Sequence, residues 1–367
     1  MNYPNPNLRY GINYRISSRK RQPLHPRNSA PAFRPPNRLT SAQLIDFDKY
    51  LRGTSEEKSA TASALLSGFQ KAGFIYLKNH GITPTTLNEV FSQSAKFFAR
   101  PQQQKDELEW YSPEANRGYT AHGREKVTQI ENKDDVEALR AQNPDLKESL
   151  EIGRDDEPGL PNMWPDKFDE AGNEFKDVMK AFHDRCKGLH MEVMRAVALG
   201  MGIEESWFDA YADRGDNTLR LLHYPGVKKD VFEQKKGQVR AGEHTDYGSI
   251  TLLFQDERGG LQVKSPNGNF IDATPIPGTV VINAGDLLAR WSNDTIKSTK
   301  HRVVEPPAKM EDSQSEEYAP RYSVAYFCNP NFDRFIDAIP GTFEKEGKRY
   351  EGVNSGEYLV RRLTATY

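Results

Sequence analysis

The stretch AGEHTDYGSITLLFQ, residues 241–255, places a histidine and an aspartate two positions apart at the start of a strongly β-prone run. Side chains alternate along a strand, so His244 and Asp246 project from the same face if the segment is extended there. The two could then bind one cation together, although two ligands hold a divalent metal only weakly. An isolated His-x-Asp pair is also typical of an ordinary polar turn, so a metal site requires a further ligand.

One candidate exists for that ligand, because His301 in STKHRVVE is the only later histidine in the chain. Two histidines and one carboxylate on one side of a metal form the facial triad of non-haem iron(II) oxygenases, which leaves positions open for a co-substrate and dioxygen. We therefore expect His244, Asp246 and His301 to bind iron(II).

The run PRYSVAYF, residues 320–327, adds a second polar pair twenty residues after His301. Arg321 and Ser323 share one face of the expected strand. A guanidinium group is suited to bidentate binding of a carboxylate, and the serine can donate a further hydrogen bond. This pair predicts an anchor for a carboxylate ligand.

Helical patterns come first in the chain and strand patterns second. Residues 56–73, 83–101 and 173–202 have the spacing and end signals of helices, and 74–81 reads as a short strand, whereas the polar region 106–165 reads as connecting loops. Short β-prone runs separated by turn residues follow, namely 218–225, 249–255, 259–264, 269–276, 279–285, 298–305 and 321–328. This order predicts an α+β fold with a jelly-roll core buttressed by N-terminal and central helices.

Three regions are therefore expected. Residues 1–43 contain many arginines and prolines and no acidic residue, which predicts a disordered basic extension. Residues 44–210 form a helical N-terminal part of the folded domain, and residues 211–367 form the jelly-roll core. The acid-free extension also resembles a mitochondrial import signal, but its prolines would break the amphipathic helix that import requires, so we expect a cytoplasmic protein.

Composition limits the class of partner. Lys and Arg number 50 and Asp and Glu number 52, so no net field recruits nucleic acid or an anionic membrane. No apolar run approaches the roughly 18 residues of a membrane span. The two cysteines, Cys186 and Cys328, form no disulfide framework or metal motif. We expect a small-molecule substrate, no nucleic acid and no membrane, and the sequence does not predict the oligomeric state.

Taken together, these motifs resemble the isopenicillin-N-synthase-like family of iron(II)/2-oxoglutarate dioxygenases, whose pattern is His-x-Asp, then His, then Arg-x-Ser. GFIYLKNHGI, NRGY, GGLQV and NAGDLLARWSND are further marks of that family, and the resemblance covers residues 44–367. It implies a double-stranded β-helix that binds Fe(II), with 2-oxoglutarate and O2 as co-substrates and ascorbate as a stimulant. It also implies that Arg321, Ser323 and Tyr224 hold 2-oxoglutarate.

Three further residues are candidates for binding the substrate. Phe327 has the same parity as Arg321, Tyr247 follows Asp246, and Arg220 shares a face with Tyr224. Two aromatic rings and a guanidinium group at the rim would suit a flat heterocycle that carries carbonyl groups. Without the family resemblance, core packing and a surface ion pair explain these three residues better.

EANRGYTAHGREKV and ARWSNDTIKSTKHRVVEPP most resemble members of the family that act on a free pyrimidine base. This resemblance implies hydroxylation of the 5-methyl group of thymine to 5-hydroxymethyluracil, with onward oxidation to 5-formyluracil and uracil-5-carboxylate. Three alternatives stay open: hydroxylation or desaturation of a secondary metabolite, an oxidase that does not use 2-oxoglutarate, and a non-catalytic sensor that retains the fold.

Overall fold

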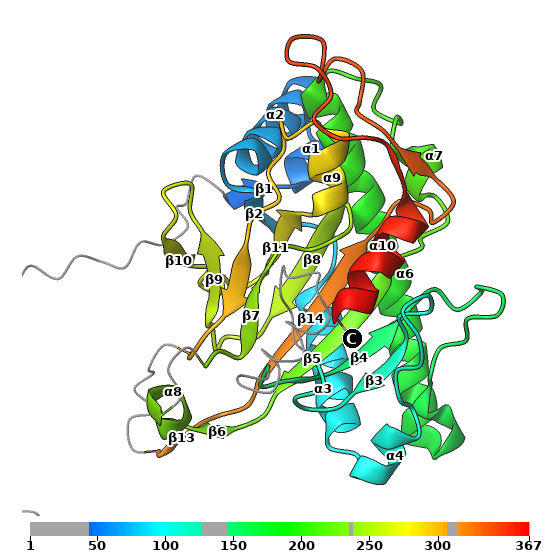
Figure 1. The fold of residues 1–367 in the computed structure, drawn as a ribbon, viewed down its shortest axis with the longest axis vertical. Helices are drawn as coiled ribbons and strands as arrows, with labels where there is room; N and C mark the ends of the chain where they lie inside the picture. The colour runs from blue at the N-terminus through cyan, green and yellow to red at the C-terminus, as the bar shows by residue number, and fades with distance from the viewer. Residues whose placement is uncertain (1–43, 126–144, 235–237, 307–314, 367) are drawn as a thin grey trace, which may run out of the picture. The chain divides into compact units, whose positions relative to one another are not determined.

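The computed structural model describes residues 44–125, 145–234, 238–306 and 315–366 (Figure 1). The predicted basic extension, residues 1–43, lies outside the described residues. The predicted boundary near residue 210 falls within a short helix, α7 (Asp209–Ala212).

An eight-stranded sheet forms the centre of the described part of the chain. Its strands lie in the order β1 (Leu44–Asp46), β2 (Phe74–Lys78), β11 (Thr279–Ala284), β8 (Ile250–Gln255), β14 (Arg321–Cys328), β5 (Thr218–Tyr224), β4 (Glu148–Ile152) and β3 (Gly118–Thr120). Strand β14 pairs antiparallel with β5, and the register sets Arg321 opposite Tyr224 and Ala325 opposite Arg220. The predicted carboxylate anchor therefore begins the strand at the middle of the sheet.

A four-stranded sheet brings two of the predicted metal ligands together. Its order is β10 (Phe270–Asp272), β9 (Leu261–Lys264), β12 (His301–Val303) and β7 (Ala241–His244). Strands β12 and β7 run antiparallel, with His301 directly opposite His244. Together with the large sheet it forms the predicted double-stranded β-helix. Two small ribbons pair β6 (Val227–Lys228) with β13 (Glu317–Tyr318) and β15 (Phe335–Ile336) with β16 (Val353–Asn354).

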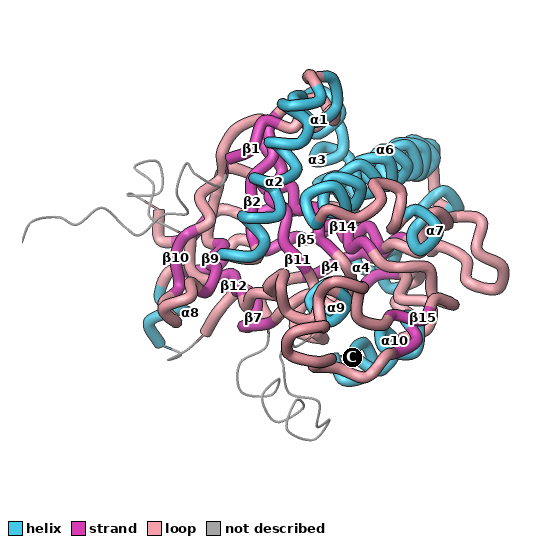
Figure 2. Tube along the Cα trace, turned by 90° about the horizontal axis from the view of Figure 1, so that it is seen from above, coloured by secondary structure: helices cyan, strands magenta, loops and turns pink. Residues whose placement is uncertain are grey.

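Helices cover one side of the large sheet. Figure 2 shows α2 and α6 on that side and β7, β9 and β12 on the other. On both sides of the sheet together, the described residues form α1 (Asp48–Arg52), α2 (Ser55–Ala72), α3 (Pro84–Phe98), α4 (Gln102–Asp106), the 3-10 turn η2 (Pro165–Lys167), α6 (Glu170–Met201), α7, α8 (Asp230–Gln234), α9 (Asp286–Trp291) and α10 (Ser355–Thr366). Among the residues that the structure describes, no helix is long and apolar enough to span a membrane.

Helix α6 confirms the predicted long core helix. Asp169 caps its first turn, and the helix ends at Gly202, whose φ of 74° a residue with a Cβ rarely adopts. The predicted apolar stripe is buried throughout: Phe175, Met179, Phe182, Cys186, Leu189, Val193 and Val197. Burial of each large apolar side chain stabilises the fold by about 1.5–3 kcal/mol, so this stripe holds the helix against the sheet.

The prediction of connecting loops over residues 106–165 is wrong for two segments, because β3 and β4 extend the large sheet. All five residues of β4, Glu148–Ile152, are buried, including both glutamates. Lys105 and His223 pair with Glu148, and Arg220 pairs with Glu151. A strand that carries charges on both faces lacks hydrophobic alternation, so the pattern of the sequence did not indicate it.

Candidate active site

Three side chains meet where β7 and β12 pair. One ligand atom from each of His244, Asp246 and His301 lies within 4.8 Å of the others, and no other such group occurs within the four described ranges. The Oδ1 atom of Asp246 is 3.7 Å from Nε2 of each histidine. Asp246 lies two residues beyond the end of β7, just before a bend at residues 247–249.

Gly248 lies in the bend that follows Asp246. A Cβ there would overlap the backbone oxygen of Cys328, so the chain can approach β14 closely only with glycine. The backbone N–H groups of Asp286 and Leu287 donate to the carbonyl groups of Asp246 and Tyr247, at 2.8 and 3.1 Å. These contacts fix Asp246 beside the paired histidines.

Hydrogen bonds orient the ligand atoms. Nδ1 of His244 lies 2.7 Å from the carbonyl oxygen of Gly242, which leaves Nε2 facing Asp246. Thr251 and Asn283 donate to Oδ2 of Asp246 at 2.5 and 2.8 Å, which leaves Oδ1 for an ion. Burial lowers the pKa of His244 to about 4, so its imidazole is in the neutral form that binds metals. The donor set therefore fits iron(II).

A cavity of about 70 Å³ contains the predicted carboxylate anchor. Arg321, Ser323 and Tyr224 all line this cavity, as do His301 and Asp246. Arg321 is 1% exposed, donates to Ser323 Oγ at 3.1 Å, and stacks 4.8 Å from the centre of the Tyr224 ring. A buried guanidinium group that lines the same cavity as the triad suits a ligand that carries two carboxylates.

A second cavity, of about 100 Å³, contains the predicted substrate residues. Arg220, Tyr247 and Phe327 line it, and helix α10 contributes Leu359, Val360 and Leu363. The Arg220 guanidinium lies 5.3 Å from the centre of the Phe327 ring. Four residues line both cavities, so the triad lies where the cavities meet: Arg220, His244, Asp246 and Phe327.

The predicted position of Arg220 at the rim is wrong, because Arg220 is 8% exposed and belongs to a buried cluster of charges that sequence reasoning missed. Its Nε lies 2.7 Å from Oε1 of Glu151, and its Nη1 lies 3.2 Å from Oε1 of Glu125. Lys147 also pairs with Glu125. Glu125 and the β4 residues fall in the region read as loops, where only the density of charges in REKV and KESLE could have suggested them.

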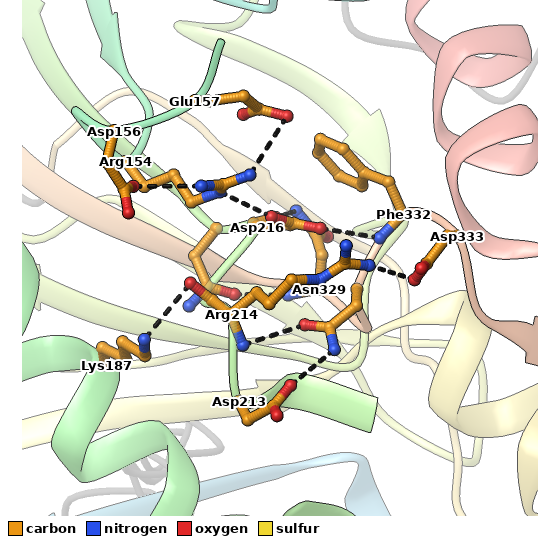
Figure 3. A network of polar contacts seen from close by, with 12 residues as sticks. Arg154, Asp156, Glu157, Lys187, Asp213, Arg214, Asp216, Asn329, Phe332 and Asp333 are labelled. Carbon is orange, nitrogen blue, oxygen red and sulfur yellow. Dashed lines mark hydrogen bonds and ion pairs between the residues drawn. The ribbon is translucent and has the colours of Figure 1, made fainter. Parts of the chain in front are cut away.

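A polar network includes two residues that line the second cavity, Asn329 and Phe332 (Figure 3). Asp216 accepts hydrogen bonds from Nε of Arg154 at 2.7 Å and from the backbone N–H of Phe332 at 2.8 Å. The backbone oxygen of Asp216 accepts from the side-chain amide of Asn329 at 2.9 Å. Since Asn329 and Phe332 line the cavity, this network ties the residues just before β5 to the cavity-lining segment after β14.

A double-stranded β-helix with a His-Asp-His triad and a buried arginine beside it defines an oxygenase that depends on iron(II) and 2-oxoglutarate. Two family models match: the N-terminal region of non-haem dioxygenases in morphine synthesis over residues 43–167, and the 2OG-Fe(II) oxygenase superfamily over residues 215–330. The chain belongs to the 2OG-Fe(II) oxygenase superfamily. It is an iron(II)/2-oxoglutarate-dependent dioxygenase that uses Fe(II), 2-oxoglutarate and O2.

Individual relatives differ in what they act on. The crystal structure of full-length Neurospora crassa thymine 7-hydroxylase with 2-oxoglutarate and thymine is 63% identical, with a TM-score of 0.81 over 88% of this chain and 96% of that chain. A 2-oxoglutarate-Fe(II) type oxidoreductase of Metarhizium rileyi is 34% identical over 89% of this chain and 91% of that protein. A proline hydroxylase of Petromyces alliaceus is 31% identical over 89% of this chain and 99% of that protein.

Proposed function

We propose that this enzyme hydroxylates the 5-methyl group of thymine to 5-hydroxymethyluracil and oxidises the product onward to 5-formyluracil and uracil-5-carboxylate. The observation that carries the proposal is the 63% identity to a structure that contains thymine. The 60% identity to the same Neurospora protein bound to 5-formyluracil supports the later steps.

The residues of the two cavities have separate tasks in this proposal. His244, Asp246 and His301 hold iron(II), while Arg321, Ser323 and Tyr224 hold the distal carboxylate of 2-oxoglutarate. When bound, iron(II) supplies oxygen activation, in which 2-oxoglutarate becomes succinate and carbon dioxide and one oxygen atom reaches the substrate. Tyr247 and Phe327 pack on the ring, and Arg220 donates to a ring carbonyl, so that the methyl group is directed toward the triad.

The curated relatives favour a second candidate function. Several fungal enzymes of this family are 30–34% identical over most of the chain, and one of them is a proline hydroxylase. An oxygenase of secondary metabolism would use the same triad and the same carboxylate anchor, because these residues do not contact the part of a substrate that distinguishes it. The apolar residues of α10 at the second cavity would then select a different organic substrate.

Turnover with purified protein separates the two candidates. The enzyme is incubated with Fe(II), ascorbate, 2-oxoglutarate and either thymine, thymidine or L-proline, and products are identified by mass. We expect thymine to give 5-hydroxymethyluracil and its further oxidation products, with one succinate formed for each oxidation step. Succinate without any oxidised pyrimidine, or an oxidised product from proline alone, would contradict the proposal. His244→Ala is the control for metal-independent background.

A further inference from the structure

Four charged side chains are buried together beside the second cavity, and the reaction described above uses only one of them. Glu125, Lys147, Glu151 and Arg220 are at most 8% exposed. Lys147 pairs with Glu125, and Arg220 contacts both carboxylates. Burial of four charges is costly unless each is paired, so we expect the cluster to have a structural or functional role.

The two carboxylates of this cluster are not equivalent. Glu125 lines the second cavity beside Arg220, whereas Glu151 lines neither cavity. Glu151 lies on β4, directly opposite Arg220 of β5, and its Oε1 is 2.7 Å from the guanidinium Nε. Glu151 therefore neutralises and positions Arg220 from the side away from the cavity. Of the two carboxylates, only that of Glu125 faces the cavity.

Glu125 is in its ionised form and can therefore only accept hydrogen bonds. Burial alone would raise the pKa of Glu125, but Arg220 and Lys147 outweigh this effect and hold that pKa at about 2. An ionised carboxylate has about four lone-pair positions, so contacts to Arg220 and Lys147 leave room for another donor. Arg220 can only donate, and its Nη1 lies 3.2 Å from Oε1 of Glu125.

We propose that Glu125 accepts a hydrogen bond from a ring N–H of the substrate while Arg220 donates to the adjacent ring carbonyl. An acceptor and a donor side by side on one wall match the lactam edge of a heterocycle, in which N–H and C=O are neighbours. The site would then reject a ring that is alkylated on this nitrogen, because the alkyl group removes the N–H donor and has to pack against a buried carboxylate. This inference rests on the proposed function and adds a specificity-determining residue to it.

Binding without turnover tests the proposal. The affinities of uracil, 1-methyluracil and 3-methyluracil for the Fe(II)- and 2-oxoglutarate-loaded enzyme are measured by calorimetry in the absence of oxygen. We expect uracil to bind at least about tenfold more tightly than one of the two methyl isomers. Equal affinity for all three would overturn the proposal.

Glu125→Gln identifies the residue responsible. Lys147 contacts Oε2 of Glu125 and Arg220 contacts Oε1, so the NH2 group of the glutamine replaces one of two acceptor oxygens and meets a donor there. The single amide oxygen of this variant cannot accept from Lys147, Arg220 and the ring N–H as the two carboxylate oxygens do. Uracil affinity should fall about tenfold or more, and the difference between the methyl isomers should shrink below about threefold. Glu151→Gln is the matched control, because it disturbs the same arginine from outside the cavity and should weaken all three ligands by a similar factor. A Glu125→Gln enzyme that keeps the wild-type ratio between the isomers would overturn the proposal.

Folding and the proposed function are checked in parallel. Glu125→Asp retains the charge and shortens the side chain by one methylene, so this variant should fold even if Glu125→Gln does not. The ratio of its affinities for the two methyluracil isomers should be smaller than in the wild-type enzyme. An unreduced ratio would contradict the proposal. Thymine turnover is measured with the same wild-type preparation. If the preference between the methyluracil isomers depends on Glu125 but thymine is not hydroxylated, the proposed function alone is overturned. If thymine is hydroxylated but the preference between the isomers does not depend on Glu125, this inference alone is overturned.

Discussion

At the scale of the residue, Asn283 and Thr251 both donate a hydrogen bond to Oδ2 of Asp246, the oxygen that does not face the two histidines. Removal of such a supporting hydrogen bond costs roughly 10- to 100-fold in metal affinity or activity. We expect Asn283→Leu to weaken iron(II) binding within this range, as measured by titration of the metal-free protein. Asn162→Leu is the control, because Asn162 bonds to Gly153 and Asp155 away from the site. Wild-type iron affinity in Asn283→Leu would contradict the assignment.

Arg321 supports a second prediction at this scale. Its Nε donates to the carbonyl of Gly259 at 2.9 Å and its Nη1 donates to Ser323, so the planar group is fixed in one orientation. Lysine keeps the charge but loses the fork that binds a carboxylate through two hydrogen bonds. Arg321→Lys should raise KM for 2-oxoglutarate about tenfold or more, a loss of about 1.4 kcal/mol or more, and change kcat less.

The control for this prediction is Arg302→Lys. Arg302 stacks 3.8 Å from the centre of the Phe270 ring and bonds to Gln262, and it lines neither cavity. Steady-state kinetics should show an unchanged KM for 2-oxoglutarate in this variant. If Arg321→Lys raised KM for the organic substrate and left that for 2-oxoglutarate unchanged, the assignment of the two cavities would be reversed.

At the scale of the element, the segment that follows β14 depends on Asp216. Asp216→Ala removes the acceptor of the Phe332 N–H and of the Arg154 guanidinium, and an unsatisfied buried donor costs about 1–3 kcal/mol. Urea unfolding should show this loss. Because Phe332 and Asn329 line only the second cavity, KM for the organic substrate should rise more than KM for 2-oxoglutarate.

Asp209→Ala provides a matched comparison, since Asp209 forms a partly exposed pair with Arg195 and lines neither cavity. A pair of this kind contributes about 0–1 kcal/mol, so both KM values should remain at the wild-type level. Equal effects of Asp216→Ala on the two KM values would show that the network supports the whole fold and not the substrate wall.

The elements that could be predicted from the sequence are those with a repeated local signal. The apolar stripe of α6 and the alternating residues of β14 each recur over several turns or residues, so the helix, the strand and the shared face of Arg321 and Ser323 were all found. The three residues of the triad could be predicted because few histidines follow residue 200. Strand β4 was missed because Glu148 and Glu151 are buried on opposite faces, and only their tertiary partners make that burial tolerable.

The position of Glu125 could not be predicted for a related reason. Its place beside Arg220 depends on tertiary ion pairs with Arg220 and Lys147, which no local pattern of residues encodes. Likewise, the bend after Asp246 packs against Cys328 at Gly248, and this close approach could not be predicted from the sequence. Short motifs thus predicted which side chains come together at the two cavities, whereas long-range packing determines how they are held.

At the scale of the whole molecule, buried histidines make the fold sensitive to acid before its carboxylates do. Burial lowers the pKa of His80 to about 4 and that of His190 to about 3. In the unfolded chain, histidine titrates near about 6.5. Between that value and the folded pKa, the unfolded state binds the additional proton, so stability falls as the pH falls.

The buried carboxylates act in a lower range. Burial raises the pKa of Glu148, but His223, Lys105 and Tyr119 outweigh it and hold that pKa at about 2. A glutamate in the unfolded chain titrates near about 4.3, so the stability that Glu148 contributes is lost between that pH and about 2. Two separate pH windows therefore follow, one for the histidines and one for the carboxylates.

The histidine window gives a prediction for the metal-free protein. Each buried histidine removes up to about 1.4 kcal/mol of unfolding free energy per pH unit below about 6.5, which is about 2 kcal/mol by pH 5. Urea unfolding at pH 7.5, 6.5, 5.75 and 5 should show this decline in unfolding free energy. In His190→Gln the decline should be smaller by the contribution of one histidine, about 2 kcal/mol by pH 5. The pH 7.5 comparison controls for packing, because there both forms of position 190 are neutral. If His190→Gln shifted every curve by a constant and left the slope unchanged, protonation of His190 would not govern the acid sensitivity of the fold.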